Sequence, residues 1–202
     1  MELRGMLHTI LSELHIGMLV LATGMIILWL IAARSRREQM RTLAIIADRT
    51  AYVAAIAGLS ALVLAALAGL YTTWEWEAVQ STVLTRNKIM ISALSMAFWG
   101  MLVYVRARQG EYVWQRPAIT GLYLALTLGG FATIVLAGSL GGVASLKGTI
   151  LDPFFDALKL NRYVMLVLPQ PINYSLIVVT LVVTAWSFWV ARSGKADRGK
   201  AR

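Results

Sequence analysis

The chain has 202 residues, of which 58% are hydrophobic and 14% charged, whereas soluble domains average roughly 45–50% apolar and 25% charged residues. This composition excludes an ordinary water-soluble fold and indicates an all-α integral membrane helical bundle. The net charge of +9 would suggest nucleic acid in a soluble protein, but these basic residues lie between apolar runs, so we expect no nucleic-acid partner. The lack of cysteine excludes disulfides, thiolate metal sites, iron–sulfur clusters and covalently attached c-type haem.

The first residues predict an interfacial amphipathic helix over 2–15, followed by a transmembrane helix over 16–33. Within 2–15, apolar side chains recur at helical spacing and leave His8, Ser12 and His15 together on the other face. The apolar run that follows is succeeded by RSRR and lacks a small-residue cleavage site, so we expect it to stay in the mature protein.

Four further apolar runs approach the roughly 20 residues that a helix needs to cross a bilayer. Before the last of them, Asp152 predicts an N-cap and Pro153 a first helical position, which indicates an outer interfacial helix over 153–168. We therefore expect one membrane domain over 1–202 with about five transmembrane helices and two interfacial helices. The predicted transmembrane helices are 16–33, 51–71, 89–105, 118–141 and 174–191, followed by a basic tail over 192–202.

Basic residues are unevenly distributed over the connections between these runs. The connections 34–50 and 106–117 and the tail together hold 13 of the 19 Lys and Arg residues. The side richer in Lys and Arg generally stays in the cytoplasm. We therefore expect a plasma-membrane protein with its N-terminus outside and its C-terminus in the cytoplasm.

Small residues recur at every fourth position in two of the predicted transmembrane helices. Such stripes let helix backbones approach closely in lipid, although small residues are also common in membrane helices generally. We expect 51–71 and 118–141 to form the centre of the bundle, and the bulky run 174–191 to lie at its periphery. The expected packing residues are Gly121, Ala125, Gly129, Thr133, Ala137 and Gly141 in one helix and Ala57, Ala61, Ala65 and Gly69 in the other.

His8 and His15 are the only histidines, and a helix would separate them by about 10.5 Å along one face. They cannot ligate one haem iron from opposite sides, so a b-type haem would need His15 paired with a methionine. Copper held by His8, His15 and Glu13 is another alternative, and a proton relay a further one. The main interpretation is a pair of hydrogen-bonded interfacial histidines. The candidate methionine ligands are Met18, Met90, Met96 and Met101, although methionines more often fill core gaps.

The outer connection after the second apolar run contains the sequence WEWE, which is Trp74, Glu75, Trp76 and Glu77. We expect the tryptophans to lie at the headgroup level with the acids in water; the alternative is a docking patch for a basic partner or a quinone headgroup. The predicted transmembrane helices contain no Lys, Arg, Asp or Glu, which argues against active transport. No triad, carboxylate pair or phosphate loop is recognisable, so we assign no catalytic residue and expect no enzymatic activity from this chain alone.

Three features occur together over residues 15–142: His15 in LHIGMLVLATG, the helix end ALAGLYTTWEW and the helix end LAGSLGG. In these features the chain resembles an uncharacterised family of four-helix bacterial membrane proteins known only as a domain of unknown function. That family tends to place a second histidine at the outer start of the third helix, where this chain has Asn87 in LTRNKIM. If the pair ligates haem or a metal in relatives, the resemblance implies that Asn87 removes one ligand here.

These observations lead to three hypotheses about function. The first is a non-catalytic accessory subunit of a larger membrane complex, in a respiratory chain or another redox complex, with other membrane subunits and bound lipids as partners. The second is a b-type haem electron-transfer subunit that uses His15 and a methionine. The third is a small stand-alone channel or carrier whose activity is sensitive to substitution of Asn87 or His15.

Overall fold

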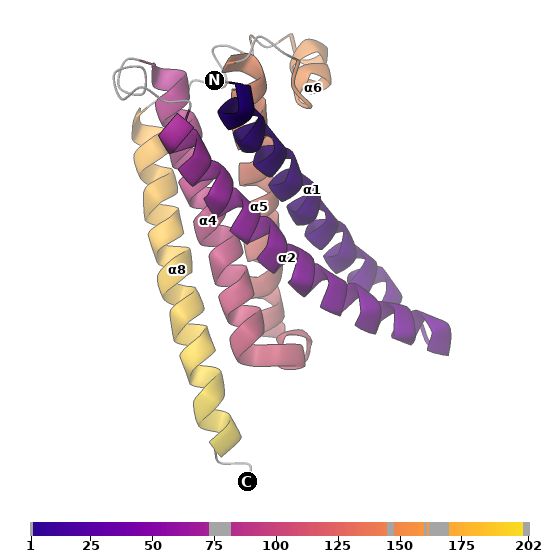
Figure 1. Ribbon diagram of the computed structural model, residues 1–202. Coiled ribbons are helices and arrows are strands. Elements are labelled where there is room, and N and C mark those ends of the chain that lie inside the picture. Colours follow the sequence, from indigo (N-terminus) through magenta and orange to yellow (C-terminus); the bar gives the residue numbers. More distant parts are fainter. Residues whose placement is uncertain (1, 73–81, 145–147, 160, 162–169, 200–202) are drawn as a thin grey trace.

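The computed structural model describes residues 2–72, 82–144, 148–159, 161 and 170–199, and these residues form helices and no strands (Figure 1). The predicted all-helical fold class is confirmed. In chain order the elements are α1 (Glu2–Ala32), α2 (Glu38–Thr72), α4 (Val83–Gln109), the 3₁₀ helix η1 (Gly110–Trp114), α5 (Pro117–Ala144), α6 (Asp152–Ala157) and α8 (Gln170–Gly199).

Four of the described helical segments are long and apolar enough to cross a membrane, which indicates a multi-pass membrane protein. The last long helix, α8, carries a shorter apolar stretch over Tyr174–Val190. The four candidate spans are Met6–Ala32, Glu38–Gly69, Val83–Trp114 and Pro117–Val143.

Helix α1 is continuous from Glu2 to Ala32, so the structure has one helix where the sequence predicted an interfacial helix and a separate transmembrane helix. Its apolar span begins at Met6, well before the predicted start at residue 16. No proline interrupts residues 2–32, and the few polar side chains near His15 are too sparse to end the helix.

Helix α2 begins at Glu38 and therefore includes most of the predicted connection 34–50. The small residues Ala44, Ala47 and Ala51 in this segment are buried. Their spacing of three and four residues places them on one face of the helix, so the helical pattern of α2 starts well before residue 51. Close packing between α1 and α2 is evident at Gly58, where an added Cβ would lie 2.5 Å from Cδ2 of Leu19. Helices α1 and α2 thus form an antiparallel hairpin.

A tight connection returns the chain from α4 into α5. Gly110 adopts φ = 58°, a left-handed conformation that favours glycine, and its N–H donates to the carbonyl of Arg106 at the end of α4. The short helix η1 follows, and the Thr120 hydroxyl donates to the carbonyl of Val113 at 2.7 Å. Helix α5 therefore runs back along α4.

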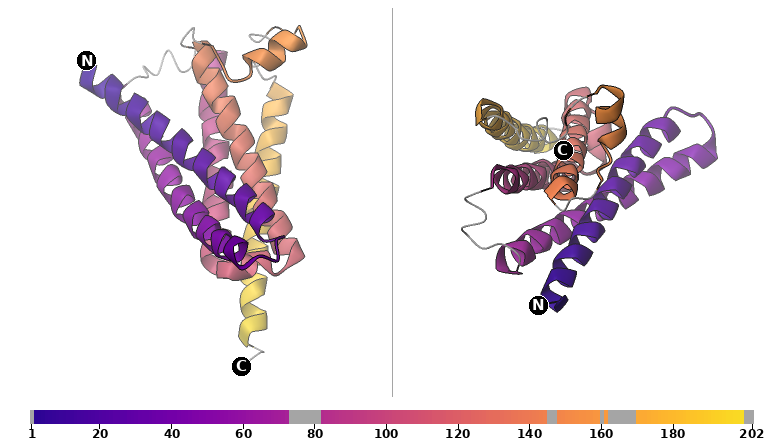
Figure 2. Two further views of the ribbon diagram at one scale, coloured as in Figure 1. Left: turned by 90° about the vertical axis from the view of Figure 1, so that its right-hand side faces the viewer. Right: turned by 90° about the horizontal axis from the view of Figure 1, so that it is seen from above.

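Helix α4 lies at the centre of the described bundle, because α5 and α8 pack along it and α2 crosses it (Figures 1 and 2). Helix α2 packs mainly on α1, and α5 packs mainly on α4. The expectation that 51–71 and 118–141 form the centre together is therefore wrong. Helix α8 lies at the edge and exposes Val178, Leu181, Val182 and Trp189.

Two clusters of buried side chains hold the described helices together. The larger cluster lies where the hairpin meets α4 and α5, and includes Ile26, Ala55, Trp99 and Leu126. The smaller cluster consists of Ile91, Leu94, Leu140, Val143 and Phe155 and contains no described residue of the hairpin. The hairpin is therefore attached toward one end of the bundle and is inclined away from the other helices (Figure 2).

Helix α6 is short and ends at Ala157, and Lys159, two residues further on, adopts φ = 52°. Half of the predicted interfacial helix 153–168, namely residue 160 and residues 162–168, lies outside the described residues. The N-cap residue is Leu151 rather than Asp152, so the predicted N-cap position is wrong by one residue. The Asp152 carboxylate instead accepts hydrogen bonds from the N–H and the hydroxyl of Thr149, at 2.8 and 2.7 Å, and closes the turn before the helix.

Candidate functional site

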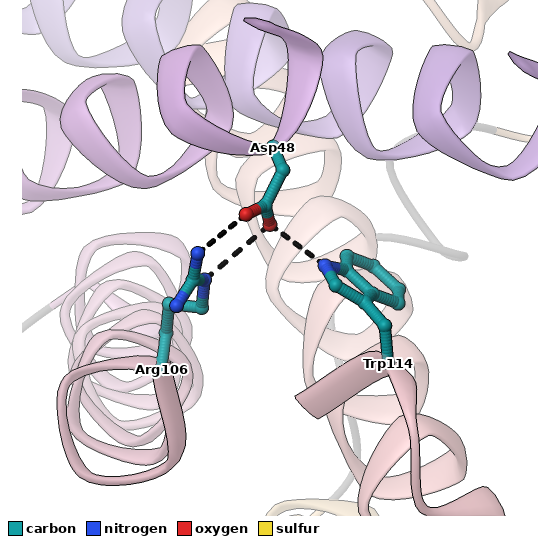
Figure 3. A network of polar contacts seen from close by, with 3 residues as sticks. All are labelled: Asp48, Arg106 and Trp114. Atoms are coloured by element: carbon teal, nitrogen blue, oxygen red, sulfur yellow. Dashed lines mark hydrogen bonds and ion pairs between the residues drawn. The ribbon is translucent and has the colours of Figure 1, made fainter. Parts of the chain in front are cut away.

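A buried ion pair connects α2 to α4 near one end of the bundle (Figure 3). Arg106 donates through Nη2 to Oδ2 of Asp48 and through Nε to Oδ1, the latter at 3.3 Å. Trp114 of η1 donates its indole N–H to Asp48 Oδ1 at 2.7 Å. The side chains of Arg106 and Asp48 are only 9% and 7% exposed, so these three residues form what we call the buried polar cluster.

Aromatic rings surround the buried polar cluster. Trp29 of α1 stacks on Trp114 with ring centroids 3.6 Å apart, and Tyr123 of α5 meets the same indole edge-on at 5.2 Å. The Arg106 guanidinium lies 5.6 Å from the ring centroid of Tyr52 on α2. The cluster and its aromatic neighbours therefore include at least one residue from each of the four candidate spans.

The geometry gives the buried polar cluster a structural role. A charge inside an apolar bundle is costly unless it is paired and hydrogen-bonded. Here the two opposite charges neutralise each other in a two-point contact, and the Trp114 N–H satisfies a further lone pair of Asp48. The arrangement fixes the hairpin to α4 and leaves no free nucleophile or general base in the cluster.

Sequence reasoning missed this cluster because Asp48 and Arg106 were both assigned to cytoplasmic connections. The positions of these two residues along their helices could have shown that both are buried. Asp48 lies four residues after Ala44 and directly follows Ala47, on the buried face of α2. Arg106 lies seven residues after the fully buried Trp99, which places it on the buried face of α4.

The two histidines both lie on α1 and form separate backbone contacts. His8 Nδ1 lies 2.9 Å from the carbonyl oxygen of Ala65 on α2, and His15 Nδ1 lies 3.1 Å from the carbonyl oxygen of Leu11. A carbonyl only accepts, so Nδ1 is the donor in each ring and Nε2 is the remaining nitrogen. His8 therefore bonds α1 to α2, whereas His15 bonds within its own helix.

Three of the four candidate methionine ligands pack against the apolar core clusters. Met90 packs against the smaller core cluster, and Met96 and Met101 pack against the larger one. Met18 approaches Gly58, where an added Cβ would lie 3.1 Å from the Met18 Cβ.

The copper site suggested for His8, His15 and Glu13 is not supported. Within the described part of the chain, no group of three His, Cys, Asp or Glu residues is arranged to hold a metal ion. Glu13 lies two positions from His15, which turns its side chain by about 200° to the other side of the helix. Asn87, at the position where the resembled family tends to have a histidine, is buried in the first turns of α4.

The small-residue stripe of α5 winds around the helix, so its members have different environments. Each four-residue step turns by about 40° beyond one full turn. Gly121 and Ala125 are consequently exposed, and an added Cβ at Gly121 would have no neighbour within 4 Å. Further along, an added Cβ would lie 2.7 Å from Cε1 of Phe98 at Gly129 and 3.1 Å from Nζ of Lys88 at Gly141, and both neighbours belong to α4.

Two more stripe members, Thr133 and Ala137, lie in the α5 segment that packs on α4. Thr133 is buried and donates to carbonyls of its own helix, those of Gly129 and Gly130, at 3.0 and 2.8 Å. Ala137 packs against the smaller core cluster. Only the later part of the predicted stripe therefore contributes to helix packing.

The shorter stripe on α2 faces α1 for most of its length. Ala57 is exposed, whereas Ala61 and Ala65 are buried. At Gly69 an added Cβ would lie 3.0 Å from Cε1 of His8, so the absence of a side chain makes room for the imidazole ring. These positions explain how α1 and α2 approach closely.

The predicted docking residues Trp74, Glu75, Trp76 and Glu77 lie outside the described residues.

Comparisons of the chain with models of protein families, with curated proteins and with solved structures find no match.

Proposed function

We propose that this chain is a non-catalytic structural subunit of a larger membrane assembly. The observation that carries the proposal is the poor coverage of α1 by the rest of the chain. Only 17% of the most apolar window in the Met6–Ala32 span is buried, compared with 39% for α2 and 44% for α5. A partner helix on the outward side of α1 would use surface that this chain leaves uncovered.

The outward side of α1 has the composition of a helix-packing surface. Gly17 and Gly24 are seven residues apart and therefore lie on nearly the same face of the helix. An added Cβ at either position would have no neighbour within 4 Å, and both residues are exposed. Exposed Val20, Ile27 and Ile31 flank them. Small residues beside bulky apolar ones allow a second transmembrane helix to approach closely.

The polar groups of the chain favour a structural role over a chemical one. The charged atoms of Asp48 and Arg106 satisfy each other inside the bundle. Within the described residues, no group of three potential ligands is arranged to hold a metal ion. In this proposal, any chemistry of the assembly belongs to its other subunits. A partner that carries haem, flavin or an iron–sulfur cluster would support the narrower expectation of a redox complex.

Site-directed cross-linking in native membranes tests this proposal, since the chain has no cysteine of its own. We expect Gly24→Cys, carrying a photoactivated thiol-linked cross-linker, to link to a different protein. Ala22→Cys, at a position that is fully buried, and Leu128→Cys, on the exposed side of α5, serve as matched controls and should link much less. Links to lipid alone, or only to a second copy of the chain, would contradict the proposal.

We further propose that α8 crosses the membrane as a fifth helix, with the N-terminus outside and the C-terminus in the cytoplasm of a plasma-membrane protein. The apolar stretch Tyr174–Val190 is close to the lower length limit for a spanning helix. Its outward side chains Val178, Leu181 and Val182 are exposed, as lipid contact requires. The excess of Lys and Arg in the connections at the end where α8 finishes supports the orientation.

A haem-binding subunit is the second candidate, and one observation favours it. His15 Nδ1 donates its proton to the Leu11 carbonyl, so the nitrogen with a free electron pair is Nε2. Many histidines that bind iron are held in this way. The purified protein would then show a reduced-haem absorption spectrum that is lost in His15→Ala and kept in His8→Ala. A colourless preparation from cells supplied with iron and haem precursor would reject this candidate.

A further inference from the structure

One end of the described bundle carries a dense group of exposed arginines. This end contains the α1–α2 turn, the α4–α5 connection and the final part of α8. The side chain of Gln109 on α4 donates a hydrogen bond to the Val190 carbonyl of α8 at 3.4 Å. The described exposed acids at this end are Glu38 and Glu111. The exposed arginines are Arg34, Arg36, Arg37, Arg41, Arg49, Arg108, Arg116 and Arg192.

Two of these arginines lie on an amphiphilic face of α2. Arg41 and Arg49 are each four residues from Ile45, whose side chain is 53% exposed, so the three follow one another along one side of the helix. The neighbouring Ile46 is also exposed. Neither guanidinium takes part in a described side-chain hydrogen bond or ion pair. This face therefore offers free cationic groups directly beside apolar surface.

The chemistry of this face matches a phospholipid. A planar guanidinium binds two phosphate oxygens at once, which the ammonium group of lysine cannot do in the same geometry. Arg106 shows the contrasting case, because it is buried and its charge is neutralised by Asp48. Arg41 and Arg49 take part in no described ion pair of this kind, and the apolar side chains between them suit an acyl chain.

We propose that the Arg41–Ile45–Arg49 face of α2 binds an anionic phospholipid. The two guanidinium groups hold the headgroup phosphate, and the acyl chain lies along Ile45 and Ile46. The surrounding exposed arginines raise the local concentration of anionic lipid without contacting it specifically. This proposal is independent of the proposed function as a structural subunit.

Native mass spectrometry of the full chain in mixed micelles tests the proposal, with phosphatidylglycerol and phosphatidylcholine as the two probes. We expect retained phosphatidylglycerol to exceed phosphatidylcholine. Replacing Arg41 and Arg49 by Gln should lower the affinity for phosphatidylglycerol by about fivefold for each arginine removed. The thermal unfolding temperature in phosphatidylcholine alone should stay unchanged, since both side chains are exposed.

The matched control is the double variant Arg86→Gln/Lys159→Gln, which removes the same charge from the opposite end. It should bind phosphatidylglycerol as the unmodified chain does. Equal retention of both lipids, or equal losses in the two double variants, would overturn the proposal. Displacement of phosphatidylglycerol by a single-stranded oligonucleotide at equal phosphate concentration would also overturn it, because the face would then serve a different polyanion.

Discussion

Asp48 shows how one acidic residue can decide the way in which helices join inside an apolar bundle. Its carboxylate accepts from Arg106 and Trp114, which lie on α4 and η1. Removing one member of a buried ion pair is more damaging than removing both, because the remaining charge stays buried without compensation. The contribution of the ion pair to stability is therefore measured by comparing the two single variants with the double variant.

We predict that Asp48→Asn destabilises the protein by about 3–5 kcal/mol, since Arg106 would keep its charge in a buried position. Equilibrium unfolding in mixed detergent micelles, followed by circular dichroism, measures this change. The double variant Asp48→Leu/Arg106→Leu is the control and should recover most of the lost stability. An Asp48→Asn variant as stable as the unmodified chain would show that the pair does not hold the hairpin.

The glycines of α5 show that position around a helix matters more than position in a sequence stripe. Gly130 lies outside the predicted stripe, yet an added Cβ there would lie 2.8 Å from Nε1 of Trp99, which is fully buried. Gly121 belongs to the stripe, yet its surroundings are open. The two glycines thus allow one substitution to be compared in two environments on one helix.

We predict that Gly130→Ala destabilises the bundle by about 1–3 kcal/mol, because the buried Trp99 ring cannot move away without disturbing the core. Gly121→Ala should be neutral or slightly stabilising, since alanine is the better helix former and nothing obstructs its Cβ. Unfolding by increasing SDS fraction compares the two variants directly. Similar stability of both would contradict the described α4–α5 contact.

The sequence predicted the helical class and the approximate apolar runs, because hydrophobic length is read directly from residue order. It did not predict the first turns of α2, because Arg41 and Arg49 made this segment look like a solvent-exposed connection although its alanines form a buried face. Asp48 was therefore expected to be exposed to water. The pairing of α5 with α4 was also missed, since a four-residue stripe does not identify the helix that it faces.

At the scale of the whole molecule, a hairpin is attached to a group of three helices centred on α4. The α1–α2 and α4–α5 connections lie at the same end, and α6 lies at the other (Figure 1). This arrangement assigns each connection to one side of the membrane. It also leaves the outward side of α1 uncovered by the described residues.

We predict that Ser35→Cys and Glu111→Cys react with a membrane-impermeant maleimide from one side, and Asn161→Cys from the other. The chain has no native cysteine, so each variant carries one reactive thiol. Labelling of intact cells and of inverted vesicles distinguishes the sides, and the positive-inside rule places Ser35 and Glu111 in the cytoplasm. Labelling of Ser35→Cys and Asn161→Cys from the same side would contradict the arrangement.

The central claim is that this chain functions as a structural subunit of a larger membrane assembly. Purification from native membranes in a mild detergent, followed by size measurement and mass spectrometry of the intact particle, tests it most directly. We predict a particle much larger than one copy of the chain that contains at least one other membrane protein in a fixed ratio. A chain that purifies alone, as a monomer in its detergent micelle, would contradict the claim.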